Sequence, residues 1–183
     1  MKITLVSFLL LVSLTAQSQD LYMTRNGKIS FFSRTPMENI DATNNEVLSV
    51  IDLQKGDMAF AVLINGFRFE KALMEEHFNE NYMESTKYPK ATFNGKFTPP
   101  AELQSKKDGT YAVQVEGDLT IHGVTRKTKA SGELIIQGGK LSSRSSFKIT
   151  IKDFNIAVPG VVAEKIAETI DVTVDCQYLP KEK

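Results

Sequence analysis

The 183-residue sequence contains a single cysteine, only two histidines and no tryptophan. One cysteine excludes an internal disulfide, and the histidines have no second cysteine or further histidine at metal-ligand spacing. Cys176 also lies far from the N-terminus, so an anchor acylated on a cysteine at the start of a mature chain is not expected. We therefore predict no metal or other cofactor, and a fold held together by its core and its backbone hydrogen bonds.

An excess of charge of either sign is also absent, because 22 Lys and Arg balance 22 Asp and Glu. Nucleic-acid binders and polybasic membrane-surface proteins need surplus Lys and Arg to collect phosphates. We therefore expect no nucleic-acid partner and at most a transient contact with a membrane. The chain is 42% hydrophobic and 24% charged, which is typical of a single globular domain and not of a disordered chain.

The apolar run Ile3–Leu14 is too short to span a bilayer as a helix, which takes about 20 residues. Lys2 precedes this run, and the small and polar residues Ala16-Gln17-Ser18 follow it, a pattern typical of a secretory signal peptide. We therefore expect a signal peptide over residues 1–18 and a mature domain over residues 19–183. This predicts an exported protein, with the periplasm as the favoured location and the extracellular space as the second.

Most of the remaining chain alternates apolar and polar residues with period two, which predicts half-buried β-strands. The long segments with this alternation are 47–53, 58–64, 91–97, 111–121, 126–136, 141–151 and 170–178. Asn26-Gly27 predicts a tight hairpin turn between two shorter strands, Leu21–Arg25 and Lys28–Ser33. Three further pairs predict turns between strands: Lys55-Gly56, His122-Gly123 and Gly138-Gly139.

Three segments break the alternation. Phe69–Tyr82 has apolar residues at spacings that suit a short amphipathic helix. Val161–Ala167 predicts a weaker helical turn, and Pro99–Gly109 predicts a polar loop. In the last strand the alternation puts Cys176 on the inward face, where a buried and unreactive thiol is expected.

About nine strands joined mostly by short turns predict sequential antiparallel pairing. Such a sheet must close into a barrel or split into a sandwich to hide its edges. The strand at 111–121 exceeds the usual length of about 5–6 residues, and at a tilt near 40° it corresponds to a barrel about 28 Å tall. We therefore predict an all-β fold, an antiparallel barrel of about eight strands with a short inserted helix. A barrel of this width is filled by side chains or holds one small ligand.

Three stretches of the sequence are recognisable motifs. The most specific is GDLTIHGVTRKTKASGEL, from Gly117 to Leu134. Two others are LMEEHFNENYMESTKYPKATFNGKF, from Leu73 to Phe97, and SSFKITIKDFNIAVP, from Ser145 to Pro159. Together they resemble, in content and order, the YceI-like family of exported polyisoprenoid-binding proteins. The resemblance covers most of the mature chain.

The resemblance implies an extended, lipocalin-like barrel that binds a long isoprenoid in an apolar tunnel, without enzymatic activity. We therefore expect an exported protein whose partner is an isoprenoid or another long-chain apolar lipid. The sequence departs from the family in the helix, where Glu75-Glu76 precede His77 in place of the common Arg-Asp pair. A ligand contact through a basic residue of that helix is therefore not carried over.

Apolar residues on the inward faces of the predicted strands would line such a tunnel, because a lipid tail gains about 0.8 kcal/mol per buried CH₂ and offers no hydrogen bonds. The candidate ligand-binding residues are Phe60, Val62, Ile64, Phe93, Phe97, Val115, Leu119, Ile121, Phe147, Ile149, Val172 and Val174. Plain core packing is the alternative interpretation for each of them. Small residues on the same faces would leave room inside the barrel, although glycine also marks bulges and bends. They are Ala91, Gly95, Gly117, Ala130 and Gly132.

The polar clusters have simple structural explanations. His122 is interpreted as a turn residue on the polar side of its strand and His77 as a polar helix residue, since neither has the partners that base catalysis needs. The acidic residues are expected to form a solvated face: Glu75, Glu76, Glu80 and Glu84. The basic residues after the His-Gly turn could attract a lipid phosphate or an anionic membrane at a barrel mouth: Arg126, Lys127 and Lys129.

Two alternatives to a lipid carrier stay open. The first is a packed structural or stress-response barrel that binds a protein partner through its helix or acidic face, without lipid cargo. The second is an enzyme acting on lipid or quinone substrates, for which the sequence offers no mutually supporting set of residues. The sequence also leaves open which lipid is bound and whether the barrel forms a homodimer.

Overall fold

The computed structural model describes residues 20–181, and the predicted signal peptide over residues 1–18 lies outside the described residues. The described chain forms a single antiparallel sheet of nine strands with a few short helices. The prediction of an all-β fold with sequential antiparallel pairing is confirmed.

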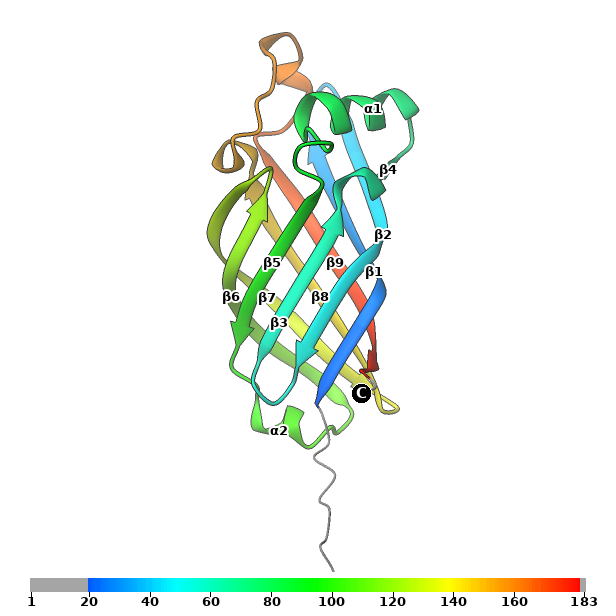
Figure 1. Cartoon of the computed structure of the whole chain (residues 1–183), viewed down its shortest axis with the longest axis vertical. Coiled ribbons are helices and arrows are strands. Elements are labelled where there is room, and N and C mark those ends of the chain that lie inside the picture. The colour runs from blue at the N-terminus through cyan, green and yellow to red at the C-terminus, as the bar shows by residue number, and fades with distance from the viewer. Residues whose placement is uncertain (1–19, 182–183) are drawn as a thin grey trace, which may run out of the picture.

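Eight of the strands close into a barrel, because β1 and β2 pair with each other as well as with their other neighbours. In chain order these strands are β1 (Leu21–Arg34), β2 (Asn39–Asp52), β3 (Asp57–Leu63), β5 (Lys90–Phe97), β6 (Gly109–Ile121), β7 (Val124–Gln137), β8 (Lys140–Thr150) and β9 (Thr169–Pro180). β4 (Arg68–Phe69) is a two-residue strand that pairs with β2 alone. Figure 1 shows the result, a tall barrel of strongly tilted strands.

The short helices lie at the two ends of the barrel (Figure 1). At the upper end α1 (Ala72–His77) continues into a single π-helical segment, η2 (Phe78–Tyr82). Two 3₁₀ segments connect β8 to β9 at the same end, η3 (Ile151–Phe154) and η4 (Gly160–Lys165). A third, η1 (Ile64–Gly66), leads from β3 to β4, and α2 (Ala101–Gln104) lies at the lower end. The helical predictions for 69–82 and 161–167 are confirmed.

The predicted turns after β2, β6 and β7 are present, and each uses residues with positive φ. Gly56 has φ +72°, and a Cβ there would lie 1.9 Å from the carbonyl oxygen of Phe97. His122 and Gly123 both have positive φ, as the favoured two-residue hairpin turn requires. The same holds for Gly138 and Gly139. These turns fix the register of the long β6–β7 and β7–β8 hairpins.

The prediction of a hairpin at Asn26-Gly27 is wrong. β1 runs without interruption from Leu21 to Arg34, and its pairing with β2 shifts register around Gly27, as in a β-bulge. Glycine is needed there because a Cβ would lie 2.5 Å from the Cys176 sulfur. The Asn-Gly signal is local, whereas β1 is held by long-range pairing with β2 on one side and β9 on the other.

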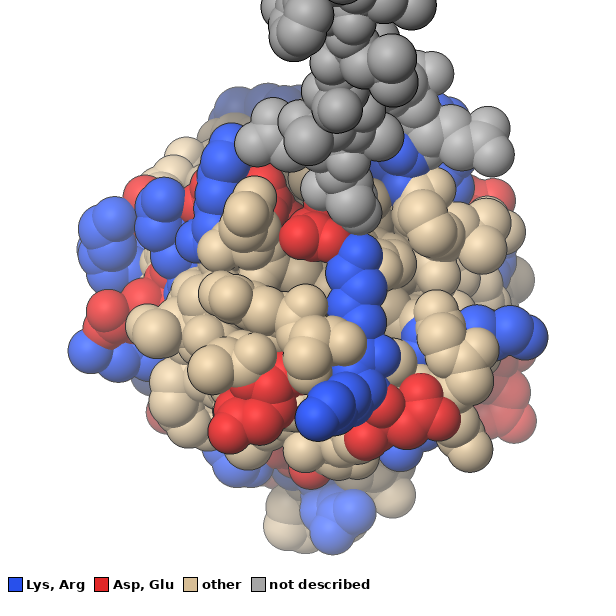
Figure 2. Space-filling model, turned by 90° about the horizontal axis from the view of Figure 1, so that it is seen from below, with Lys and Arg blue, Asp and Glu red and all other residues tan. Residues whose placement is uncertain are grey.

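The prediction of a plain polar loop over 99–109 is also wrong, because the segment contains α2. Leu103 on this helix is fully buried and belongs to a packed layer of side chains at the lower end of the barrel. Other members of this layer are Ile51, Leu53, Phe97, Ile136, Leu141 and Tyr178. Seen from below, the visible part of this end is covered by charged side chains of both signs and by other residues (Figure 2). The barrel is therefore closed at the α2 end.

Candidate functional site

The barrel interior above the packed lower layer contains a cavity of about 610 Å³. This is within the range of about 300–1,000 Å³ that is usual for small-molecule sites. Its walls are mostly apolar side chains contributed by all eight strands of the barrel. The residues at its lower limit include Met58, Val113, Leu134 and Ser143.

The structure places eleven of the twelve candidate ligand-binding residues around this cavity. They are Phe60, Val62, Ile64, Phe93, Val115, Leu119, Ile121, Phe147, Ile149, Val172 and Val174. Phe97 is the exception, because it is buried in the core at the α2 end, where β5 terminates. Period-two alternation identifies the inward face of a strand but not the height along the barrel at which packing gives way to open space. That these residues contact a ligand stays a prediction.

A buried polar chain of hydroxyl groups spans the interior just below the cavity. The Tyr178 hydroxyl lies 3.0 Å from Ser49 Oγ and 3.1 Å from Ser143 Oγ. Burial raises the pKa of Tyr178, so the phenol stays neutral and suits hydrogen bonding to two serines. Burial also raises the pKa of the neighbouring Cys176 thiol to about 11. Cys176 lies on the inward face and is only 1% exposed, as the alternation predicts.

Four phenylalanines form a cluster beneath α1 and η2 at the upper end of the cavity. Phe31 of β1 contacts Phe67, Phe69 and Phe78 at ring-centroid distances of 5.5, 5.7 and 5.5 Å. Phe78 also lies 5.0 Å from Phe69 and 5.6 Å from Phe67. All four line the cavity. The helical segment is therefore a lid whose underside continues the apolar lining.

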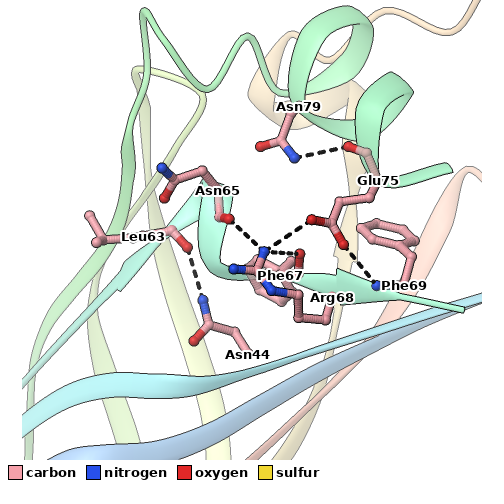
Figure 3. Close-up of polar contacts among 8 residues, drawn as sticks. All are labelled: Asn44, Leu63, Asn65, Phe67, Arg68, Phe69, Glu75 and Asn79. Atoms are coloured by element: carbon pink, nitrogen blue, oxygen red, sulfur yellow. Dashed lines mark hydrogen bonds and ion pairs between the residues drawn. The ribbon is translucent and has the colours of Figure 1, made fainter. Parts of the chain in front are cut away.

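The position of this lid is fixed by Glu75 (Figure 3). One carboxylate oxygen of Glu75 accepts a 3.0 Å hydrogen bond from Arg68 Nη1, and the other accepts one from the Phe69 backbone N–H. Arg68 also donates to the carbonyls of Asn65 and Phe67. Of the expected acidic face, Glu75 is thus a structural group that joins α1 to β4.

His122 does more than form a turn, which corrects its interpretation as a simple turn residue. Its side chain is only 10% exposed, and its Nε2 lies 2.9 Å from Glu84 Oε2. Its Nδ1 lies 3.2 Å from the Phe154 carbonyl, and its ring packs edge-on against Tyr88 with centroids 4.4 Å apart. His122 therefore joins the β6–β7 turn to the segment after η2 and to η3. Neither ring nitrogen faces the cavity, since both are engaged by these oxygens.

The basic residues after the His122-Gly123 turn are also engaged within the chain. Lys127 pairs with Asp118 at 2.9 Å, and Lys129 pairs with Glu116 across the β6–β7 hairpin. Arg126 Nε donates to the Asp153 carbonyl at 2.8 Å. The two lysines therefore form ion pairs along the outer surface and Arg126 is bound to η3, so the cluster is not a free cationic patch.

The small inward residues have two different roles. Ala91, Ala130 and Gly132 line the cavity as expected. Gly95 and Gly117 are directly opposite each other on β5 and β6, and the Phe93 ring lies over both. A Cβ at Gly95 would lie 2.4 Å from this ring, and one at Gly117 would lie 2.8 Å from it. These two glycines thus make room for Phe93 and not for a ligand.

Sequence reasoning missed several lining residues, mostly outside the long regular strands. They include Phe31, Phe67, Phe69, Met74, Phe78, Met83, Ile156 and Val158. Only Phe69, Met74 and Phe78 carried a signal, since they lie in the segment with helical spacing. The others lie in irregular segments or, for Phe31, in β1, where the local Asn26-Gly27 turn signal conceals a continuous strand.

Within residues 20–181, no three His, Cys, Asp or Glu side chains are grouped so that they could hold a metal ion. In the same part of the chain, no helix has the length and apolar character needed to cross a membrane.

The sequence is similar to proteins of one known family. A family model described as the YceI-like domain matches residues 20–178. Protein YceI of Shigella flexneri is 38% identical over 82 residues, which cover 42% of this chain and 39% of that protein. The match thus spans less than half the length of the curated relative.

Two solved structures share the fold at low sequence identity. A polyisoprenoid-binding domain from Saccharophagus degradans, implicated in plant cell wall breakdown, superposes with a TM-score of 0.75 at 12% identity, covering 89% of this chain and 99% of that one. Burkholderia cenocepacia BcnA superposes with a TM-score of 0.70 at 15% identity, covering 84% of this chain and 96% of that one.

Proposed function

The chain belongs to the YceI-like domain family, and from this premise we propose that it is an exported, non-enzymatic protein that binds one long apolar lipid of the isoprenoid type inside its barrel. The cavity carries this proposal. It is about 610 Å³ in volume, its walls are apolar, and the packed α2 end closes it below. A long chain without polar groups gains free energy in such a space, at about 0.8 kcal/mol per buried CH₂. The Saccharophagus degradans neighbour, described as a polyisoprenoid-binding domain, supports the choice of ligand class.

A carrier role also requires a way to take lipid from a membrane, and we propose a transient contact through the upper end. Three large apolar side chains are exposed there on separate segments. Met37 lies between β1 and β2, Leu73 on α1 and Val161 on η4, with exposed fractions of 64%, 60% and 93%. Side chains of this kind on the rim of a cavity suit shallow insertion between lipid head groups.

The packed barrel that binds a protein partner is less well supported. A packed barrel would have a filled interior, whereas this barrel contains a cavity. The Glu75 carboxylate of the acidic helix already accepts hydrogen bonds from Arg68 and the Phe69 backbone, so it is not free to bind a partner. An enzymatic role has no support from the histidines, because His122 is engaged by Glu84 and the Phe154 carbonyl. Export is supported by the signal-peptide pattern of residues 1–18.

The proposal is tested by mass spectrometry of organic extracts of the protein purified from the compartment in which its native host places it. We expect one long-chain apolar lipid at near-stoichiometric amounts in the wild type. Val115→Trp places a large ring in the cavity, and Gln114→Trp places the same ring at the neighbouring outward position of β6. Only Val115→Trp should lose the lipid. A wild-type protein without lipid, or equal lipid in both variants, would overturn the proposal, and the N-terminus of the purified protein tests export.

A further inference from the structure

The barrel wall has two places where pairing between neighbouring strands stops before the upper end. Between β2 and β3 only four residue pairs form, the last at Leu48 and Ala61. This first gap is covered by other parts of the chain. β4 pairs with β2 above it, and the Asn44 side chain donates a 2.9 Å hydrogen bond to the Leu63 carbonyl.

The second gap lies between β7 and β8, and no strand of the described chain covers it. The β7–β8 ladder ends at Gly132 and Ser145, although β7 stays paired with β6 up to Val124 and β8 stays paired with β9 up to Thr150. The upper part of β7 bows outward at the edge of the barrel (Figure 1). The uppermost part of this gap is covered by η3, because Arg126 Nε donates a 2.8 Å hydrogen bond to the Asp153 carbonyl. We name the remaining opening, between residues 127–132 of β7 and 145–150 of β8, the side slot.

The cavity extends to the side slot. Inward-facing residues of both strands line it there: Thr128, Ala130, Gly132, Ser145, Phe147 and Ile149. Glu133 and Arg144, which pair with each other near the end of the ladder and are exposed, line the cavity as well. The small side chains of Thr128, Ala130 and Gly132 leave the opening unfilled.

The side slot offers hydrogen-bonding groups that the strands do not use. Neighbouring residues of a strand direct their backbone groups to opposite sides, so alternate residues face the same neighbour. The Ser131 carbonyl faces β8, where it accepts a 2.7 Å hydrogen bond from the Ser145 hydroxyl. The backbone groups of Lys129 and Lys127 therefore face the slot, beyond the last strand pair. Such groups need a partner, which is water or a polar group of a ligand.

The charges around the side slot are balanced within the chain. Arg144 pairs with Asp175 at 3.1 Å, and Lys148 pairs with Asp171. On the β7 side, Lys127 and Lys129 pair with carboxylates of β6. A phosphate in the slot would have to compete with these carboxylates for its cations, whereas an uncharged group would meet only hydroxyl and backbone partners.

We propose that the side slot holds the uncharged polar end group, such as a hydroxyl or carbonyl, of the long chain whose apolar part lies in the cavity. The inference rests on the proposed function and narrows its ligand class to neutral amphiphiles. It also places the polar end in the side wall and not under the lid formed by α1 and η2.

Three C15 isoprenoids that share one chain and differ in their end group test the proposal: farnesene, farnesol and farnesyl diphosphate. Each displaces a fluorescent apolar probe, diphenylhexatriene, from the delipidated protein. Ala130→Leu adds volume to the cavity wall at the slot, and Ala91→Leu adds the same volume on β5, away from it. Ala130→Leu should lower the affinity for farnesol about threefold to tenfold more than the affinity for farnesene, which corresponds to the loss of one hydrogen bond. Ala91→Leu should lower the affinities for farnesol and farnesene by the same factor. The affinity for farnesyl diphosphate should fall equally in the two variants.

Thr128→Val is a second, near-isosteric slot variant, and circular dichroism checks that all variants fold. Thr128→Val should also lower the affinity for farnesol by a few fold and leave the affinity for farnesene unchanged. If no C15 compound displaces the probe from the wild type, the proposed function itself fails. If the compounds bind but each slot variant lowers the affinities for farnesol and farnesene equally, the end group lies elsewhere. In that case only the slot proposal is wrong. A selective loss of the diphosphate in Ala130→Leu would contradict the choice of an uncharged group.

Discussion

The His122 side chain joins three segments of the upper end of the barrel. It accounts for two polar contacts and one aromatic contact among three segments of the upper end. We expect His122→Ala to lower the free energy of unfolding by about 2–3 kcal/mol, because it removes the ring and leaves the Phe154 carbonyl without this partner. Urea unfolding followed by circular dichroism measures the change.

The control for this substitution is the other histidine. His77 is exposed at the end of α1, so His77→Ala should change stability by no more than about 0.5 kcal/mol. Equal effects of the two substitutions would show that the contacts of His122 do not contribute to the folded state.

Cys176 should be almost unreactive in the folded protein. Its pKa is raised to about 11 from an ordinary value of 9.0, chiefly by burial, so its thiolate fraction at pH 8 is about 100-fold below that of an exposed thiol. Its reaction with a thiol-specific chromogenic disulfide at pH 8 should therefore be at least about 100-fold slower in buffer than in urea. Similar rates in the two solvents would mean that the lower barrel opens readily.

The same shift predicts a loss of stability at high pH. The folded state holds the Cys176 proton more tightly than the unfolded state, so this contribution is fully present below about pH 9 and is lost as the pH rises toward 11. Urea midpoints at pH 8 and pH 10.5 should differ more for the wild type than for Cys176→Ala. An equal decrease in both proteins would assign the pH dependence to other groups.

At the scale of elements, α2 has a role out of proportion to its four residues. Leu103 is fully buried in the layer that closes the barrel, whereas Glu102 beside it is exposed. We expect Leu103→Ala to lower the free energy of unfolding by about 2–5 kcal/mol, as large-to-small substitutions in well-packed cores do. Glu102→Ala should change it little. Thermal unfolding measures both. A small effect of Leu103→Ala would mean that the lower end collapses around the missing side chain.

The elements also show how far local sequence signals reach. Period-two alternation predicted the strands well, because each residue of a barrel wall faces either water or the interior. The Asn26-Gly27 and Pro99–Gly109 predictions failed because distant parts of the chain decide those segments. Gly27 is required by the approach of Cys176, and α2 forms because Leu103 fills the end of the barrel.

At the scale of the molecule, the candidate site was predictable in its side walls but not in its two ends. Strand alternation identified which residues face inward, and eleven of them line the cavity. The height of the packed lower layer decides that Phe97 lies in the core and not at the cavity. This height and the position of the phenylalanine cluster depend on how separate segments meet. The side slot depends on where two strands diverge, which no residue pattern of either strand records.

The cavity makes ligand binding and global stability inseparable, because a lipid inside the barrel binds the folded state and not the unfolded chain. At a free lipid concentration of 100 times Kd the folded state gains about 2.7 kcal/mol. For a domain of this size, with an unfolding entropy of about 2.1 cal/mol/K per residue, that gain raises the melting temperature by about 8 °C. Scanning calorimetry of delipidated protein with and without added farnesol should show this shift in the wild type and a much smaller one in Val115→Trp. The same shift in both proteins would mean that the alcohol binds outside the cavity.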